Sequence, residues 1–166
     1  MLGVSRGEVR KALQKLEFCG VIHTEAQRGS YVSDHYFSSL VSTRILLESE
    51  ASRLSAELRT EEEMSRIIAA RDAFEAHPCV ELDLAFHYTI MQASHNTVLT
   101  ALWKTAIAEV EAYYQRYSVC RPDDPKVLRE HAILAGAIRA KDPQAAADAL
   151  ARHLNSIREL SQKIDK

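Results

Sequence analysis

The chain has 166 residues, of which 46% are hydrophobic and 27% are charged, and its formal net charge is −2 at pH 7. This length fits one domain with its own core and a part of a second, and the composition excludes a disordered or fibrous chain. No stretch approaches the roughly 18 uninterrupted apolar residues of a membrane span, and the N-terminus lacks the apolar region of a signal peptide, so we expect a cytoplasmic protein with no membrane partner.

The first predicted element is a short amphipathic helix that begins after Ser5. Ser5 and Glu8 have the spacing of a capping box, in which the two residues satisfy free backbone N–H groups at the start of a helix. Apolar residues then recur at the helical spacing i, i+3, i+4 and i+7: Val9, Ala12, Leu13 and Leu16. Gly20 is a typical stop signal. Residues 1–35 carry five Lys and Arg against four Asp and Glu, so this part of the chain is only slightly basic.

A β-hairpin is predicted next. Residues 21–24 and 30–32 are β-prone runs on either side of Gln27-Arg28-Gly29, which is typical of a hairpin with a longer loop. A helix followed by a hairpin is the second half of a winged helix. We therefore predict a partial winged helix-turn-helix domain at residues 1–35, joined through the linker Ser33-Asp34-His35 to an all-helical domain at residues 36–166.

Every periodic segment from residue 36 onward is helical, and the connections are short, which predicts an all-α fold with six helices in an antiparallel bundle. Capping residues mark four of the starts: Thr60 with Glu63, Asn96, Asp124 before Pro125, and Asp142 before Pro143. The predicted helices are residues 36–59, 61–76, 80–94, 97–119, 125–140 and 143–164.

Three of these helices place a histidine on their apolar face. Helix 80–94 carries Asp83 and His87 one turn apart, helix 125–140 carries His131, and helix 143–164 carries His153. A single histidine in such a position is more often a hydrogen-bonded core residue than a ligand. Three of them with an aspartate would each cost about 1 to 3 kcal/mol to bury without partners, and one divalent ion would satisfy all four. We therefore predict a metal site that suits Zn²⁺, Ni²⁺, Mn²⁺ or Fe²⁺.

Two sets of residues resemble a known family. The first set resembles the recognition helix and wing of GntR transcriptional regulators: Leu2-Gly3-Val4-Ser5-Arg6, Val9-Arg10, Ala12-Leu13, Leu16, Gly20-Val21 and Arg28-Gly29-Ser30-Tyr31-Val32. The second set resembles the ligand-binding FCD domain of their FadR subfamily: Arg44-x-x-Leu47-Glu48, Asp83-x-x-Phe86-His87, Asn96, Glu130-His131 and His153. Six helices in this domain fit its VanR-like branch.

The resemblance implies a homodimeric, DNA-binding transcriptional regulator. It also implies that Asp83, His87, His131 and His153 are the metal ligands and that a small carboxylate effector completes the metal's shell. Family members have a first helix and most of a second before the point at which this chain starts. We therefore expect a truncated DNA-binding domain that binds an operator weakly.

DNA contacts are expected from the start of the first helix and from the tip of the wing. Arg6 and Arg10 lie one turn apart at the end that a recognition helix presents to bases and phosphates, although two such arginines also fit an ordinary solvated face. Arg28 and Gly29 at the wing tip would meet a phosphate or the minor groove, and Ser5 belongs to the same predicted set.

Arg44 and Asn96 are the predicted effector-binding residues. Arg44 lies on an apolar stripe, where a buried guanidinium needs acceptors that either a ligand carboxylate or an internal salt bridge, for example to Glu48, would supply. Asn96 is most simply the N-cap of helix 97–119. Its second interpretation is that its side chain lines the effector pocket. Two other functions stay open. They are a metal-dependent enzyme, for which no obvious separate general base is present, and a pure metal sensor, each using the same Asp and three His.

Overall fold

The computed structural model describes residues 3–117 and 123–164. Within these ranges the chain forms seven helices and one two-stranded sheet, which confirms the all-α class with a small hairpin. The chain divides into two compact units, Met1–Ser39 and Leu40–Lys166. The boundary predicted between residues 35 and 36 stays a prediction. None of the helices in the described ranges is both long and apolar enough to cross a membrane.

The first unit contains α1 (Arg6–Phe18), β1 (Ile22–Glu25) and β2 (Gly29–Val32), as the sequence predicts. The capping box forms, because the backbone N–H of Glu8 donates to Ser5 Oγ at 3.3 Å and that of Ser5 donates to Glu8 Oε2 at 2.8 Å. The strands are antiparallel, with Ile22 opposite Val32 and Glu25 opposite Gly29. Gly29 has a φ of +116°, a conformation that side chains with a Cβ rarely adopt.

The helix α2 (Asp34–Leu58) begins two residues before the predicted start. The predicted linker at residues 33–35 is therefore wrong for all but Ser33, because no proline or glycine follows it and the backbone N–H of Tyr36 donates to the Ser33 carbonyl at 2.9 Å. From Val41 onward, α2 buries one face that is formed mainly by polar and small residues: Val41, Arg44, Glu48, Ala51, Ser52, Ser55 and Ala56.

Five further helices complete the second unit, and each lies within a few residues of its predicted bounds: α3 (Glu61–Ala76), α4 (Val80–Ala93), α5 (Thr97–Tyr117), α6 (Pro125–Arg139) and α7 (Pro143–Ile164). The end predicted for the fourth of the six helices, residue 119, lies outside the described residues. The local start signals operate as expected, since Thr60 and Glu63 form a capping box and Asp124 caps α6 through the N–H of Lys126 at 2.8 Å.

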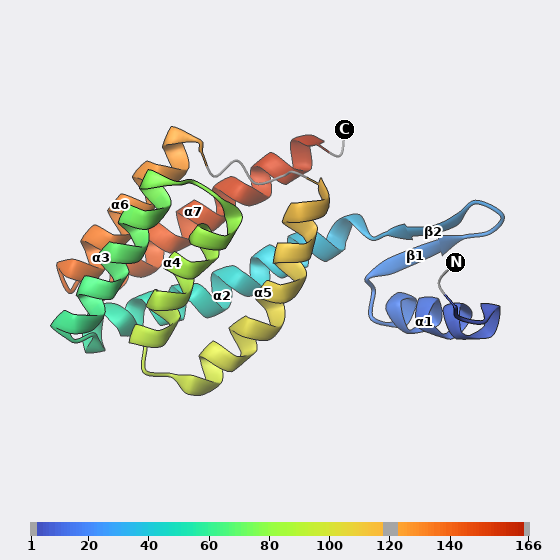
Figure 1. The fold of residues 1–166 in the computed structure, drawn as a ribbon, viewed down its shortest axis with the longest axis horizontal. Helices are drawn as coiled ribbons and strands as arrows, with labels where there is room; N and C mark the ends of the chain where they lie inside the picture. Colours follow the sequence, from blue (N-terminus) through green and yellow to red (C-terminus); the bar gives the residue numbers. More distant parts are fainter. Residues whose placement is uncertain (1–2, 118–122, 165–166) are drawn as a thin grey trace. The chain divides into compact units, whose positions relative to one another are not determined.

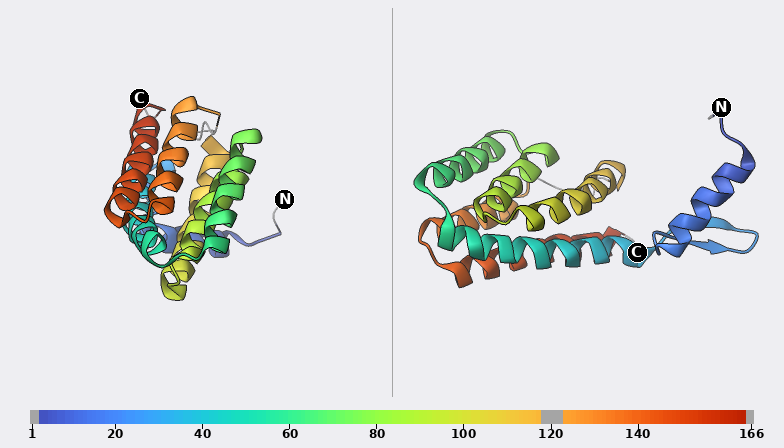
Figure 2. Two further views of the ribbon diagram at one scale, coloured as in Figure 1. Left: turned by 90° about the vertical axis from the view of Figure 1, so that its left-hand side faces the viewer. Right: turned by 90° about the horizontal axis from the view of Figure 1, so that it is seen from below.

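The helices of the second unit pack around one core (Figures 1 and 2). α3 packs on both α4 and α6, α6 packs on α7, and α4 packs on α5. Large apolar side chains from these helices are almost fully buried: Ile67, Phe74, Phe86, Ile90, Met91, Leu134, Ile138, Leu150 and Leu154. Each such side chain contributes roughly 1.5 to 3 kcal/mol to folding, which holds the three histidine-bearing helices at fixed distances.

Candidate metal centre

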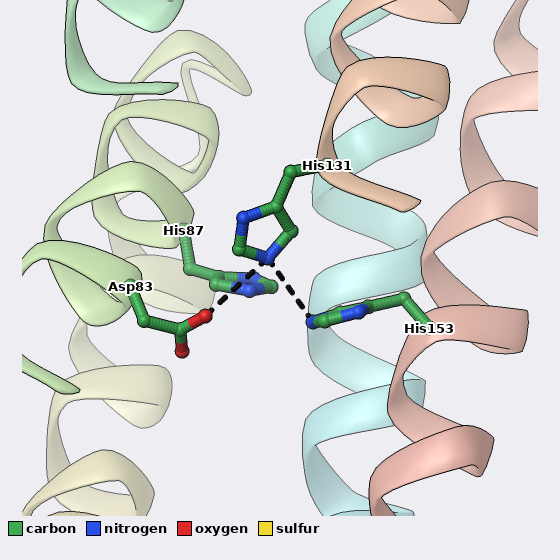
Figure 3. A group of neighbouring side chains, drawn as sticks. All are labelled: Asp83, His87, His131 and His153. Atoms are coloured by element: carbon green, nitrogen blue, oxygen red, sulfur yellow. Dashed lines mark hydrogen bonds and ion pairs between the residues drawn. The ribbon is translucent and has the colours of Figure 1, made fainter. Parts of the chain in front are cut away.

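The four predicted ligands meet at one point in the interior of the second unit. α4 supplies Asp83 and His87, α6 supplies His131 and α7 supplies His153, and Figure 3 shows the four side chains converging from these three helices. One ligand atom from each residue lies within 4.8 Å of the other three. All four residues are at most 2% exposed. The helical spacing predicted this cluster, and the packing of α4, α6 and α7 brings it together.

The spacing of the atoms at the centre fits a divalent ion. His131 Nε2 lies 3.3 Å from Asp83 Oδ1 and 3.2 Å from His153 Nε2. With metal–ligand bonds of about 2.1 Å, neighbouring ligand atoms lie about 3.0 Å apart in an octahedral shell and about 3.4 Å apart in a tetrahedral one. Both measured distances fall between these values, so a single ion fits among the three atoms without a large rearrangement.

Two glutamate carboxylates lie close to the Nδ1 atoms of two of the histidines. His153 Nδ1 lies 3.0 Å from Glu130 Oε2, and Glu130 is also held by the hydroxyl of Ser156 at 3.0 Å. His87 Nδ1 lies 2.7 Å from Glu48 Oε2, although its N–H is not aligned with that oxygen as a hydrogen bond requires. Carboxylates in these places favour the proton on Nδ1 of each ring and leave Nε2 as a lone-pair donor that faces the cluster.

The centre therefore contains buried lone pairs that have no hydrogen-bond donor. Among the described residues, His87 Nε2 and Asp83 Oδ2 have no hydrogen-bond partner, although both atoms are buried. Leaving such atoms unsatisfied costs about 1 to 3 kcal/mol each. A divalent cation would satisfy them at once, because neutral imidazole nitrogens and carboxylate oxygens are its ordinary ligands. The residues present thus fit a metal ion.

Burial also holds His131 and His153 in the form that binds metals. Burial lowers the pKa of His131 well below its usual value, and the neighbouring histidines and Arg44 lower it further. Burial likewise lowers the pKa of His153, although its hydrogen bond to the Glu130 carboxylate opposes this effect. Both rings are therefore neutral at neutral pH, and a metal ion does not have to displace a proton from them.

His131 is held by aromatic packing. Its ring lies against Phe86 at 4.6 Å and Phe74 at 4.8 Å between centroids. Its Nδ1 is buried and has no hydrogen-bond partner within the described part of the chain. His153 is therefore held by a hydrogen bond to a carboxylate, whereas His131 is held by ring contacts.

Arg44 lies fully buried and pairs with Glu48 one turn along α2. Arg44 Nε donates to Glu48 Oε1 at 2.6 Å and Nη2 donates to Oε2 at 3.3 Å, so the internal salt bridge considered for Arg44 forms. Burial raises the pKa of Glu48, but the charge and hydrogen bonds of Arg44 and the closeness of His87 lower it more, so the net pKa is well below its usual value. The carboxylate is therefore ionised. The effector role predicted for Arg44 stays a prediction.

Asn96 does not join this cluster. Its side chain is exposed, and its Oδ1 accepts the backbone N–H of Leu99 at 3.0 Å, so it is the N-cap of α5. Asn96 lines a separate cavity of about 400 Å³ between α4 and α5, together with Tyr88, Gln92 and Lys104. The four cluster residues are absent from the lining of that cavity.

The predicted DNA-contacting residues all lie on the surface of the first unit. Arg6 and Arg10 are exposed on α1, where the described residues of the helix are not buried. The Arg28 side chain is 76% exposed and pairs with Glu25 at 3.0 Å. Ser5 serves the capping box, and Gly29 begins β2 at the turn of the hairpin.

The spacing of residues in the sequence did not indicate the role of the two glutamates. Glu48 is identifiable as a partner of Arg44 from the i, i+4 spacing, but its contact with His87 joins two helices that are far apart in sequence. Glu130 lies next to a ligand in the sequence and pairs with a different ligand, His153, on α7. The position of Glu130 beside the inward-facing His131 is the one sequence signal for the Glu130–His153 contact.

Together these features define an all-helical domain with a candidate metal centre, following a helix and a hairpin. The FCD domain family matches residues 39–156 of the chain. The chain therefore belongs to the FCD-domain family, and it is a transcriptional regulator of the GntR type.

Named relatives agree with this assignment. The Glc operon transcriptional activator of Escherichia coli strain K12 is 29% identical, over 95% of this chain and 74% of that protein. The HTH-type transcriptional regulator LutR of Bacillus subtilis is 24% identical, over 95% of this chain and 84% of that protein. The placement in the VanR-like branch stays a prediction.

Solved structures share the fold. A GntR family regulator from Pseudomonas syringae has a TM-score of 0.65 and 27% identity, over 98% of this chain and 72% of that one. A metal-free FCD domain of the regulator TM0439 has a TM-score of 0.64 and 20% identity, over 81% of this chain and 96% of that one.

Proposed function

We propose that this regulator binds one divalent metal ion through Asp83, His87, His131 and His153, and that the metal and a small organic acid control its binding to DNA. The observation that carries the proposal is the convergence of four buried ligand atoms within 4.8 Å, with two carboxylates behind the rings. Ligands of this type suit Zn²⁺, Ni²⁺, Mn²⁺ or Fe²⁺. When bound, the ion would act as a Lewis acid that offers its remaining positions to a carboxylate.

Arg44 supports an anionic effector at this site. Its guanidinium is buried, and its charge reaches the cluster, since it contributes to the lowered pKa of His131 and of His153. A small carboxylate on the metal would bring negative charge into a region that already holds a buried cation. Asn96 is left out of this site because it caps α5 and lines a different cavity.

We expect small hydroxycarboxylates and dicarboxylates to raise the melting temperature only when metal is bound. The physical reason is mass action, since a ligand at 100 times its Kd adds about 2.7 kcal/mol to the folded state. The measurement compares lactate, malate and citrate with chloride as the control anion, each on chelator-treated and on Zn²⁺-loaded protein. Equal stabilisation of the chelator-treated protein would remove the metal from the effector site.

A pure metal sensor is the second candidate, and the complete burial of all four ligands favours it. The same melting experiment separates the two candidates. Stabilisation by Zn²⁺ with no further effect of any carboxylate would support the pure sensor and reject the effector proposal.

We further propose that α1 and the tip of the hairpin contact DNA, and that the regulator acts as a homodimer. Arg6 and Arg10 support the contact because they are exposed and share the N-terminal end of α1. α1 buries none of its residues in this chain, and its apolar residues Val9, Leu13 and Leu16 stay 37 to 44% exposed. A helix that is so weakly anchored retains phosphate contacts better than base readout.

Binding to the promoter beside the gene is expected to be weak and steeply dependent on salt. Replacement of Arg6, Arg10 or Arg28 with Ala should each reduce the slope of log K against log [salt] by about 0.9 if that side chain neutralises a phosphate. Lys15→Ala is the matched control, because Lys15 lies at the other end of α1 and should leave the slope unchanged. Tight, sequence-specific binding that survives high salt would contradict this expectation.

A further inference from the structure

Glu48 connects three helices through one buried carboxylate. The residue is 2% exposed and lies on α2. Its Oε1 accepts from Arg44 Nε at 2.6 Å and from Trp103 Nε1 of α5 at 2.8 Å. Its Oε2 accepts from Arg44 Nη2 at 3.3 Å and lies 2.7 Å from Nδ1 of His87 on α4. Both oxygens therefore face only groups that donate.

In this arrangement the imidazole ring of His87, a proposed metal ligand, lies between the Glu48 carboxylate and the cluster. His87 Nε2 faces the cluster, while its Nδ1 lies at contact distance from Glu48 without the alignment of a hydrogen bond. A metal on Nε2 would fix the orientation of the ring and bring its Nδ1–H onto Oε2. The other oxygen of the same carboxylate accepts the Trp103 N–H. A reorientation of the His87 ring can therefore alter the surroundings of the indole through the Glu48 side chain alone.

Resting on the metal site proposed above, we propose that Glu48 is a positioning residue for His87, which sets the metal affinity of the site and makes Trp103 report its occupancy. Glu48 touches no metal and acts only through the imidazole. Outer-shell carboxylates of this kind typically change metal affinity 10- to 100-fold when they are replaced. Trp103 is well placed as a reporter, because it is 3% exposed and stacks on Tyr88 at 5.8 Å between ring centroids.

The sequence provides the spectroscopic readout, since Trp103 is the only tryptophan in the chain. Chelator-treated protein is titrated with Zn²⁺, which carries no unpaired electrons that would quench fluorescence, while the indole emission and the bound metal are both measured. In the unmodified chain we expect the emission to change and to saturate together with Zn²⁺ binding.

Glu48→Gln is the first test variant. An amide has one acceptor and one donor end, so either orientation turns an NH₂ group toward donors, and His87 or Trp103 loses its acceptor. We expect Zn²⁺ affinity to fall about 10- to 100-fold and the emission change to be lost or strongly reduced. Glu50→Gln is the matched control, because Glu50 lies on the same helix and pairs with Arg53 at the surface, with 45% of its side chain exposed.

A second variant keeps the test decisive if the first fails to fold. Arg44→Met with Glu48→Leu removes the buried charges together, which is often neutral for stability. Loss of the Arg44 cation by itself favours a metal cation nearby, so a fall in Zn²⁺ affinity in this double variant reports the loss of Glu48. Circular dichroism establishes that each variant compared is folded.

The outcomes separate the two proposals. If the Glu48 variants bind Zn²⁺ as tightly as the unmodified chain and with the same emission change, the positioning role is wrong and the metal site stands. If the unmodified chain binds no Zn²⁺, or a variant that lacks His131 and His153 binds it equally well, the metal site is wrong and the positioning role falls with it.

Discussion

Replacement of both His131 and His153 with Ala is expected to reduce bound metal to nearly none and to lower the melting temperature of the purified protein. These two residues supply the Nε2 atoms that lie 3.2 Å apart at the centre of the cluster, and they come from different helices. A metal present at 1,000 times its Kd adds about 4.1 kcal/mol to the folded state, which corresponds to roughly 8 to 16 °C for a protein of this size.

Elemental analysis of protein purified without added metal measures the first effect, and calorimetry before and after treatment with a chelator measures the second. His77→Ala is the control, since His77 is an exposed histidine at the end of α3 and should change neither quantity. Full metal occupancy in the double variant would show that the four-residue assignment is wrong.

Arg44→Ala is expected to destabilise the protein by about 3 to 5 kcal/mol. The cost arises because the Glu48 carboxylate would stay buried without its main counter-charge, and an unpaired buried charge is far more costly than a missing surface pair. A loss of this size is a large part of the 5 to 15 kcal/mol that holds a typical domain folded. Denaturant unfolding followed by circular dichroism provides the measurement.

Arg53→Ala is the matched control for this prediction. Arg53 lies on the same helix and pairs with Glu50 and Glu57, but its side chain is 36% exposed, so its removal should cost less than about 1 kcal/mol. If Arg44→Ala and Arg53→Ala cost the same, the buried pair does not contribute as its geometry indicates. A carboxylate effector that stabilises the Arg53→Ala variant against unfolding but does not stabilise the Arg44→Ala variant would also support a contact between the effector and Arg44.

The sequence alone determined the helices and the hairpin of this protein. Their starts depend on local signals such as the Ser5–Glu8 and Thr60–Glu63 boxes, in which the interacting groups are three residues apart. The periodicity of apolar residues then determines which side chains face inward. This is why Asp83, His87, His131 and His153 were identifiable as a candidate metal site before the packing of the helices was known.

Only the tertiary structure decided which polar groups meet between helices. The contacts of Glu48 with His87 and Trp103, and of Glu130 with His153, depend on the rotation and spacing of packed helices, which local periodicity does not encode. The i, i+4 spacing indicated Glu48 as a partner of Arg44, but only the fold shows that the pair is buried and that it also contacts Trp103. A buried charge is paired by whichever acceptor the packing brings within about 3 Å, so its partner is a property of the assembled core.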